Sequence, residues 1–270
     1  MKKLIGFLLV FILSAQTFAN DGWVVRGRCN ARGNVTYLQR YFIDGNKVKF
    51  EQYNFIYSCD LSSGKLILID IDSMLCAVTT INDYEEKNTK IYEDFLLNSF
   101  LKFWDSFADN DIDTANASVI IDNKFSPISE DSITITKIND GMKLLGHNVS
   151  EYEVRVNNKR VERFFHTYEV ACFNSVDLNA LNNLENLIHP TDYSFHYTAT
   201  QKYTDFKKNG LIIRRFLYVD DFVEEYQVNW YENTDIPAFH YEVPWQCKVI
   251  SLDKWFELFH PTNRKYDDYE

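Results

Sequence analysis

An acidic stretch near the middle of the chain, DNDIDTAN, carries side chains at the spacing of a calcium-binding loop. Asp109, Asp111 and Asp113 alternate along it, and Ca²⁺ takes carboxylate oxygens at alternating positions of an EF-hand loop. Such a loop also requires Gly at its sixth position and Glu at its twelfth. The chain has Thr114 and Ile120 there, so the motif fails. We expect a solvated acidic loop and no resident metal.

The six histidines are spread singly through the chain. They form neither an H-E-x-x-H motif nor an i, i+4 pair, which are the local signatures of a zinc site. His196 and His240 fall on predicted strands or at their ends, and nothing local brings them together. We interpret the histidines as structural residues rather than metal ligands or general bases, and we predict no cofactor.

The sequence gives little support for nucleophilic or carboxylate catalysis. A serine hydrolase needs Ser, His and Asp around an exposed nucleophile, and the chain has no G-x-S-x-G motif. The acidic pairs Asp220-Asp221 and Glu224-Glu225 are adjacent, but neighbours on a strand point to opposite faces. A glycosidase needs both carboxylates in one cleft. The sequence therefore predicts a protein that is not an enzyme, with no catalytic residues.

None of the five cysteines belongs to a C-x-x-C pair, so zinc and thioredoxin-type chemistry lack support. In an oxidising compartment they allow one or two disulfides, with at least one thiol left over. Their spacing leaves the pairing open. The cysteines are Cys29, Cys59, Cys76, Cys172 and Cys247.

The N-terminus has the pattern of a secretory signal. Lys2 and Lys3 precede an apolar run, and small residues lead to a cut between Ala19 and Asn20. The apolar run is too short for a membrane span, which needs about 20 residues, and no later stretch is long enough. We therefore expect a signal peptide at 1–19, a mature chain without a transmembrane segment, and a periplasmic or secreted protein.

The composition of the chain argues against a nucleic-acid partner. The formal net charge is −11, which makes the chain a poor electrostatic match for nucleic acid. Aromatic residues make up 16% of the sequence, while Gly and Pro are few, as expected of a globular, β-rich protein. We predict no nucleic-acid partner, and the oligomeric state stays open.

The first predicted hairpin is RYFIDGNKVKFE. A turn at Gly45-Asn46 places Ile43 opposite Val48 and Tyr41 opposite Phe50 on one face. Agreement between turn chemistry and cross-strand pairs is a strong hairpin signal. Further strands are predicted at the runs KLILID and MLCAVTT.

A second hairpin is predicted over residues 151–166. Asn157 and Asn158 suit a two-residue turn with positive φ, which would place Val154 opposite Val161. Tyr152, Val156 and Phe165 would share that face. The ionisable residues are of the kind expected on a solvated strand face, so we interpret this hairpin as a wall of the fold and not as a catalytic element.

Hydrophobic periodicity predicts three helices. Residues 85–108 have a broad apolar face, and we interpret this helix as a lid or plug. A second is expected over 176–188, and a third at SLDKWFELF, with Ser251 as its N-cap. Residues 195–206, with the segments that follow, are predicted as a strand meander. The order predicts an α+β protein, mainly antiparallel β: an unclosed half β-barrel with helices covering its concave mouth.

Four segments in shared order resemble the LolA/LolB-like lipoprotein-carrier superfamily, in particular its secreted members of unknown function. They are Asp44 to Lys47, Ile69-Asp70, Gly146 to Lys159 and Phe239 to Pro244. The resemblance implies a single LolA-like domain over 20–270, with an apolar cavity between sheet and helices. The carriers also have a helix directly after the signal, which is not predicted here, and none of their functional residues is carried over.

The predicted function is therefore non-enzymatic binding in the cell envelope. The partner would be an apolar small molecule, a lipid or a lipidated protein, held in the cavity of the curved sheet. The alternative is an envelope protein–protein interaction module without a lipid cavity, and a secreted hydrolase is a third hypothesis. The candidate ligand-binding residues are Phe95, Leu97, Leu101, Trp104, Trp230 and Trp245.

Overall fold

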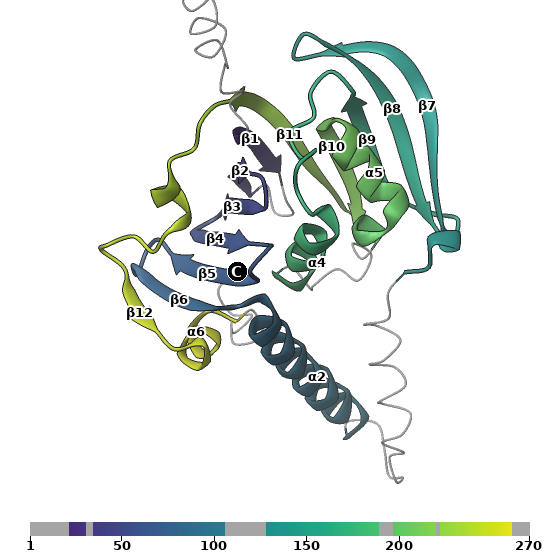
Figure 1. Ribbon diagram of the computed structural model, residues 1–270. Coiled ribbons are helices and arrows are strands. Elements are labelled where there is room, and N and C mark those ends of the chain that lie inside the picture. Colours follow the sequence, from purple (N-terminus) through teal and green to yellow (C-terminus); the bar gives the residue numbers. More distant parts are fainter. Residues whose placement is uncertain (1–21, 31–34, 106–127, 189–196, 220–221, 261–270) are drawn as a thin grey trace, which may run out of the picture.

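The computed structural model describes residues 22–30, 35–105, 128–188, 197–219 and 222–260. In these residues one sheet of twelve strands accompanies four α-helices (Figure 1). The sheet is not closed into a barrel, and helices cover its concave side. This confirms the predicted α+β class and unclosed sheet. The predicted signal peptide and its cleavage site, like the acidic loop with Asp109, lie outside the described residues.

The strands in chain order are β1 (Gly22–Asn30), β2 (Thr36–Asp44), β3 (Lys47–Gln52), β4 (Phe55–Asp60), β5 (Lys65–Asp70), β6 (Leu75–Thr80), β7 (Ile133–Leu144), β8 (His147–Val156), β9 (Lys159–Thr167), β10 (Leu211–Val219), β11 (Phe222–Asn233) and β12 (Lys248–Ile250). The α-helices are α2 (Ile81–Asp105), α4 (Leu178–Ile188), α5 (Gln201–Asn209) and α6 (Leu252–Phe259). Short 3-10 helices lie at η2 (Glu130–Ser132) and η4 (Ala238–Tyr241).

The first strand lies in the middle of the sheet and joins its two halves. The strand order is β12-β6-β5-β4-β3-β2-β1-β11-β10-β9-β8-β7. Every neighbouring pair is antiparallel except β12 and β6, which are parallel. Because β1 bonds to both β2 and β11, it brings residues from the two ends of the chain onto one surface.

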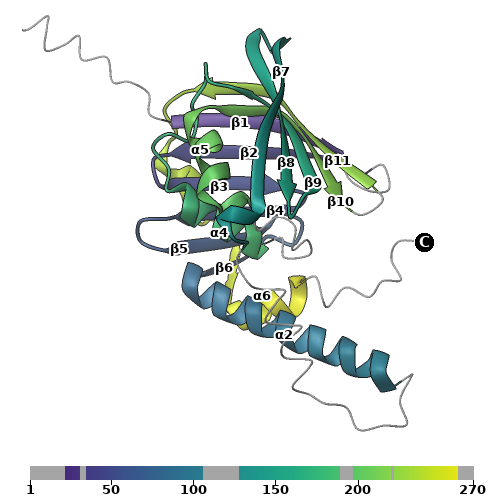
Figure 2. The same ribbon diagram turned by 90° about the vertical axis from the view of Figure 1, so that its right-hand side faces the viewer.

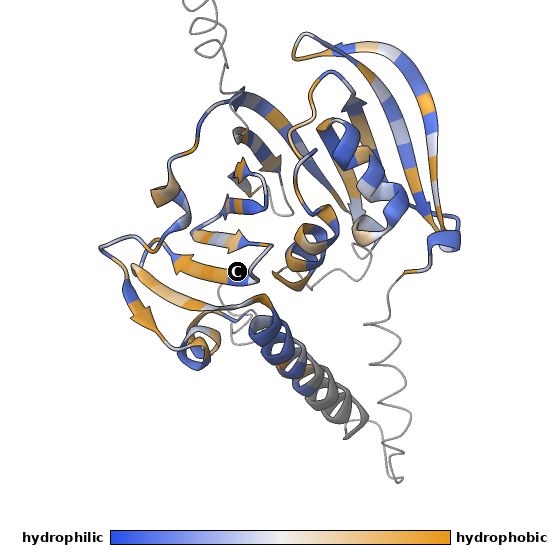
Figure 3. Cartoon of the chain, in the orientation of Figure 1, coloured by the Kyte–Doolittle hydropathy of each residue, from blue (hydrophilic) through white to orange (hydrophobic). Residues whose placement is uncertain are grey.

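Figure 2 shows α4 and α5 lying against the concave side of the sheet, while α2 and α6 lie at the edge formed by β6 and β12. In Figure 3 strands β4 to β6 are coloured mainly hydrophobic and α5 mainly hydrophilic. The largest buried cluster joins strands from both halves of the sheet to α4 and α6. A second cluster lies between the second half of the sheet and α5.

The first hairpin has the predicted register. Ile43 lies opposite Val48, and Tyr41 lies opposite Phe50. Gly45 has a φ of +56°, a left-handed conformation that glycine adopts without steric cost. Local turn chemistry was sufficient to predict this part of the structure.

The second hairpin has the predicted turn but a different register. Asn157 and Asn158 both have positive φ, at 49° and 65°. A β-bulge next to Val154 shifts the pairing by one residue, so that Val154 lies opposite Glu162 and not opposite Val161. The predicted pairing was wrong because a bulge adds one unpaired residue to one strand.

That bulge reverses the faces of the β9 side chains, since successive residues of a strand point to opposite sides. Tyr152 pairs with Phe164, and Phe165 pairs with Glu151 on the other face. Glu162 is fully buried, with a relative exposure of 0%. The expectation that the ionisable residues of this hairpin face solvent was therefore wrong for Glu162. It was also wrong for Glu151 and His166, which are buried.

Three predicted helices are present with adjusted ends. Helix α4 buries the predicted apolar face, including Leu181 and Leu184. Helix α6 follows Ser251, whose hydroxyl accepts a hydrogen bond from the Lys254 amide at 3.2 Å. Helix α2 begins at Ile81, four residues before the predicted start.

The predicted strand over 195–206 was wrong, because helix α5 begins within this segment, at Gln201. The alternation of aromatic and Thr residues favoured a strand, whereas Tyr203 and Phe206 fall on one helical face and pack in the second cluster. The amides of Gln201 and Lys202, at the helix start, donate to the Glu130 carboxylate. Unsatisfied N-terminal amides need such acceptors, and this one comes from a distant part of the chain.

Candidate functional site

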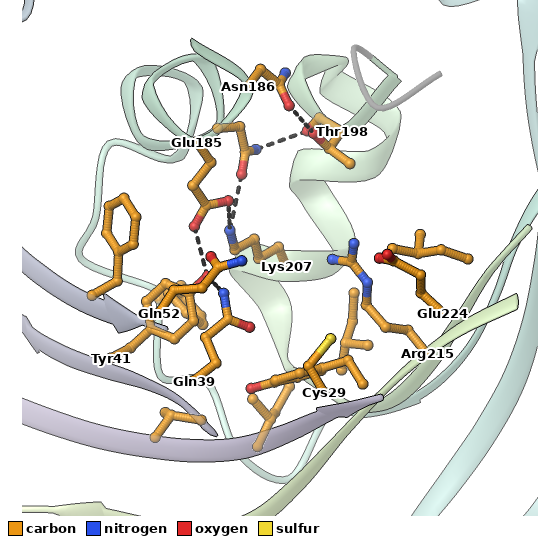
Figure 4. Close-up of a pocket in the computed structure, with 18 of the residues that line it drawn as sticks. Cys29, Gln39, Tyr41, Gln52, Glu185, Asn186, Thr198, Lys207, Arg215 and Glu224 are labelled. Carbon is orange, nitrogen blue, oxygen red and sulfur yellow. Dashed lines mark hydrogen bonds and ion pairs between the residues drawn. The ribbon is translucent and has the colours of Figure 1, made fainter. Parts of the chain in front are cut away.

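A cavity of about 360 Å³ lies between the concave face of the sheet and the helices α4 and α5 (Figure 4). We call it the central cavity. Strands β1, β2 and β3 form one side, β10 and β11 form another, and the two helices close it opposite the sheet. Its size is at the small end of the range for ligand pockets, which is roughly 300–1,000 Å³.

The wall of the central cavity is mixed in character. Apolar side chains such as Val25, Phe50 and Leu217 lie beside charged and amide side chains such as Glu185 and Arg215. The sequence predicted an apolar cavity. The difference arises because polar residues of β2, β3 and β10 lie on the concave side of the sheet. There they face polar residues of α4 and α5 across the cavity.

A hydrogen-bond network centred on Glu185 connects α4 to the sheet and to α5. The Tyr41 hydroxyl donates to one Glu185 oxygen at 3.0 Å, and the Gln39 amide donates to that hydroxyl at 3.1 Å. The Lys207 ammonium lies 3.1 Å from the other Glu185 oxygen and 3.0 Å from Asn182 Oδ1. Burial and the nearby Glu185 raise the pKa of Tyr41 well above its usual value, so Tyr41 stays a neutral donor.

Protein groups use two of the three N–H donors of Lys207. Glu185 balances its charge and Asn182 takes a further hydrogen bond. Asn182 in turn donates to the Thr198 carbonyl at 2.8 Å. A ligand would meet this part of the wall as a preformed surface in which Glu185, Asn182 and Lys207 already bond to one another or to neighbouring residues.

A second buried carboxylate lies beside two residues of the cavity wall, Tyr203 and Arg215, and does not line the cavity itself. Glu162, on β9, accepts hydrogen bonds from the hydroxyls of Tyr197 and Tyr203 at 2.6 and 3.0 Å. Its carboxylate lies 3.8 Å from the Nε of Arg215, on β10. Burial raises the pKa of Glu162, while Arg215 and the two phenols oppose that shift.

The position of Glu162 argues for a structural role. A carboxyl group with a raised pKa beside a cavity is a candidate general acid. Both oxygens of Glu162, however, are occupied by tyrosine hydroxyls, and the residue has no accessible surface. It cannot reach a ligand, and it holds Tyr197 and α5 against the sheet while balancing the charge of Arg215.

Arg215 is the charged group that faces the central cavity with unused donors. It lines the cavity, and 28% of its side-chain surface is accessible. Its guanidinium forms no hydrogen bond with any residue in the described part of the chain, and its Nε is buried without a partner. Glu162, at 3.8 Å, is too distant to accept a hydrogen bond.

Cys29 also lines the central cavity, next to Tyr37. Burial raises the pKa of its thiol, and the thiolate is the nucleophilic form of cysteine. Its environment therefore disfavours nucleophilic chemistry. In the described ranges no group of three His, Cys, Asp or Glu side chains is arranged to hold a metal ion.

The structure places the described candidate ligand-binding residues away from the central cavity. Phe95, Trp230 and Trp245 are 38%, 39% and 88% exposed, and none of them lines it. The Arg26 guanidinium lies over the Trp230 ring, with its central carbon 5.2 Å from the ring centre. The side chains of Leu97, Leu101 and Trp104 lie outside the part of the structure that is described.

The residues that line the cavity were not found from the sequence. Tyr41 and Phe50 were identified only as a cross-strand pair, and Arg215 and Glu185 were assigned no role. One signal was present, because the alternation of β10 places Arg215 on the same face as Leu217. The convergence of that face with α4 depends on contacts between distant segments.

No helix among the described residues has an apolar stretch long enough to cross a membrane.

Comparison with known proteins gives distant structural likenesses only. No family model matches the chain, and no curated protein matches it. An uncharacterised conserved protein from Thermus thermophilus aligns with 85% of this chain and 90% of its own at 6% identity and a TM-score of 0.43. A structure of PNGF-II aligns over 89% of this chain and 33% of its own, at 6% identity and a TM-score of 0.36.

A third structure is a putative outer membrane lipoprotein-sorting protein domain from Vibrio parahaemolyticus. It aligns with 86% of this chain and 94% of its own at 9% identity and a TM-score of 0.26. Of these three structures, it is the one whose description names lipoprotein sorting. At these TM-scores the likenesses carry no functional argument, and the site is interpreted from its own residues.

Proposed function

We propose that this chain is an exported, non-enzymatic binding protein of the periplasm or cell exterior, which holds a small amphipathic molecule in the central cavity. The observation that carries the proposal is the cavity itself, which lies between a concave sheet and two helices. Its apolar side chains would take a short acyl chain or a similar group. Each buried methylene would contribute about 0.8 kcal/mol.

The Glu185 network supports a binding role over a catalytic one. It joins Tyr41 on β2, Glu185 on α4 and Lys207 on α5 into one hydrogen-bonded unit. Such a unit keeps the two helices at a fixed distance from the sheet and so keeps the cavity open. The buried Cys29 thiol and the enclosed Glu162 carboxyl leave the cavity without a suitably placed nucleophile or general acid among the described residues.

Native mass spectrometry of the mature protein, purified gently from an envelope fraction, tests this proposal. We expect a retained small-molecule mass that is lost in Asn186→Trp, because Asn186 lines the cavity from α4 and an indole there would fill it. The matched control is Asn183→Trp on the exposed side of the same helix, which should keep the mass. Equal retention by both variants would place the ligand elsewhere.

The alternative function is a protein–protein interaction module. It predicts a bare protein mass and a stoichiometric envelope partner whose binding is the same in Asn186→Trp and in the wild type. Cross-linking in the envelope fraction before purification, followed by mass spectrometry, distinguishes the two functions.

A further inference from the structure

The unused donors of Arg215 define the chemical class of the ligand. A guanidinium presents N–H donors in a planar fork that matches a carboxylate. In most buried sites protein acceptors occupy that fork, because an unpaired buried donor costs free energy. Arg215 makes no hydrogen bond with the described residues and lines the central cavity. Because Nε is buried and part of the side chain is still accessible, the terminal Nη groups are the donors that a molecule in that cavity could reach.

The surroundings of Arg215 favour one end of an amphipathic molecule over a wholly polar ligand. Arg215 lies between Ile212 and Leu217 along β10, and all three line the cavity. Val25 and Phe50 extend the apolar wall toward the first half of the sheet. A ligand with one charged end and an apolar body would match both parts of the wall.

The other charges in the cavity leave Arg215 as the anion-binding group. Lys207 is paired with Glu185, so it adds little attraction for an anion. Glu162 lies behind Arg215 with both oxygens bonded to tyrosines. Glu224, on β11, also lines the cavity. A single carboxylate placed against Arg215 is the head group that this arrangement accepts.

We propose that the ligand of the central cavity is a small amphipathic carboxylic acid whose carboxylate pairs with the Arg215 guanidinium. This inference rests on the proposed function and specifies its ligand. The volume of about 360 Å³ suits one short chain rather than several acyl chains. The pairing gives orientation, because a charge-assisted bidentate contact fixes one end of the molecule.

Calorimetric titration with decanoate and decanol tests the carboxylate, since the two molecules share a chain and differ in head group. We expect the wild-type protein to bind decanoate at least about tenfold more tightly than decanol, the factor that corresponds to roughly 1.4 kcal/mol. Arg215→Gln should remove that difference and leave decanol binding unchanged. Arg215→Lys, which keeps the charge and loses the fork, should give an intermediate preference.

The outcomes of this titration, taken with native mass spectrometry, separate the acid inference from the proposed function. Equal binding of decanoate and decanol by the wild type would overturn the acid inference and leave the binding function standing. If neither binds while native mass spectrometry shows a retained mass, the ligand is of another class. If neither binds and the mass is bare, both proposals fail.

Discussion

Glu162 and Arg215 lie on adjacent strands with 3.8 Å between Oε1 and Nε, yet the carboxylate hydrogen-bonds to two tyrosines and not to the guanidinium. The carboxylate balances the charge of the arginine without using its donors. One residue of the pair is fully buried, and the other faces the central cavity. The fold thus keeps an arginine charged inside the protein, with its Nε buried and unpaired and 28% of its side-chain surface accessible.

The first prediction concerns the stability provided by Glu162. We expect Glu162→Gln to lower the free energy of unfolding by about 2 kcal/mol, because it leaves the Arg215 charge without its nearest counter-ion. Urea denaturation followed by circular dichroism measures the change. Glu153→Gln, on the same hairpin, breaks ion pairs with Arg155 and Arg160 at the surface and should cost less than about 1 kcal/mol. Equal losses would contradict a special role for Glu162.

The second prediction concerns the contact between Gly27 and Tyr226. A Cβ atom at Gly27 would lie 2.3 Å from the Tyr226 ring, and that ring lines the central cavity. We expect Gly27→Ala to lower the free energy of unfolding by about 1–3 kcal/mol through overpacking. A double-mutant cycle with Tyr226→Ala checks the cause, since Gly27→Ala should be nearly neutral once the ring is absent. Additive losses would point to backbone strain instead.

The third prediction is a loss of stability in acid that depends on His166. Its Nε2 donates to the Phe206 carbonyl at 2.8 Å, and burial lowers its pKa to about 4. Because the folded pKa is below the unfolded value of 6.5, the unfolded chain takes up the proton first. Stability is therefore complete above pH 6.5 and falls as the pH drops toward 4, by roughly 3 kcal/mol at about 1.4 kcal/mol per pH unit.

Urea titrations at several pH values between about 4 and 7 measure this slope. His166→Phe should be less stable than the wild type at neutral pH, because it loses the hydrogen bond to Phe206, and should show a flatter dependence in acid. His260, whose pKa is also lowered to about 4 by burial, should retain part of the slope in that variant. An unchanged slope would show that other groups control acid unfolding.

The fourth prediction is a single preferred disulfide. Strand β12 lies beside β6 with Val249 opposite Cys76, and Cys247 packs against Cys76 within hydrogen-bonding reach. With oxidised glutathione as the oxidant, thiol–disulfide exchange should link Cys76 to Cys247 and release two molecules of reduced glutathione. Peptide mapping without reduction should find this pair alone, with Cys29 still a thiol.

Cys76→Ser provides the control for this pairing. In that variant Cys247 should form only a mixed disulfide with glutathione, because it loses its neighbour. A bond between Cys247 and any other cysteine would contradict the arrangement of β12 along β6. The pairing of the cysteines could not be predicted from the sequence, because the spacing of cysteines along the chain does not determine which strands become neighbours.

The sequence was sufficient wherever the deciding interactions are local. The Gly45-Asn46 turn set the register of β2 and β3, since turn geometry determines the pairing of a short hairpin. The apolar period of α4 and the Ser251 cap of α6 located two helices. From such elements the unclosed antiparallel sheet with covering helices could be predicted, because many hairpins and few helices leave few other architectures.

The candidate site depended on interactions that a single stretch of sequence does not contain. One bulge beside Val154 turned Glu162 from the expected solvent face into the interior, because a shift of one residue reverses the faces of a strand. Glu130 accepts bonds from the first amides of α5 across a long sequence separation. The alternation within that segment is typical of a strand, so its helical form could not be predicted locally.

Hairpin turns, helix faces and the fold class followed from the order of residues alone, because turn chemistry and hydrophobic period act over a few residues. Which side chains share the central cavity was settled by long-range packing, since β1 joins the two halves of the sheet and places Tyr41, Arg215 and Glu185 around one space. Those three residues come from β2, β10 and α4. Contacts between such distant segments leave no local signature in the chain.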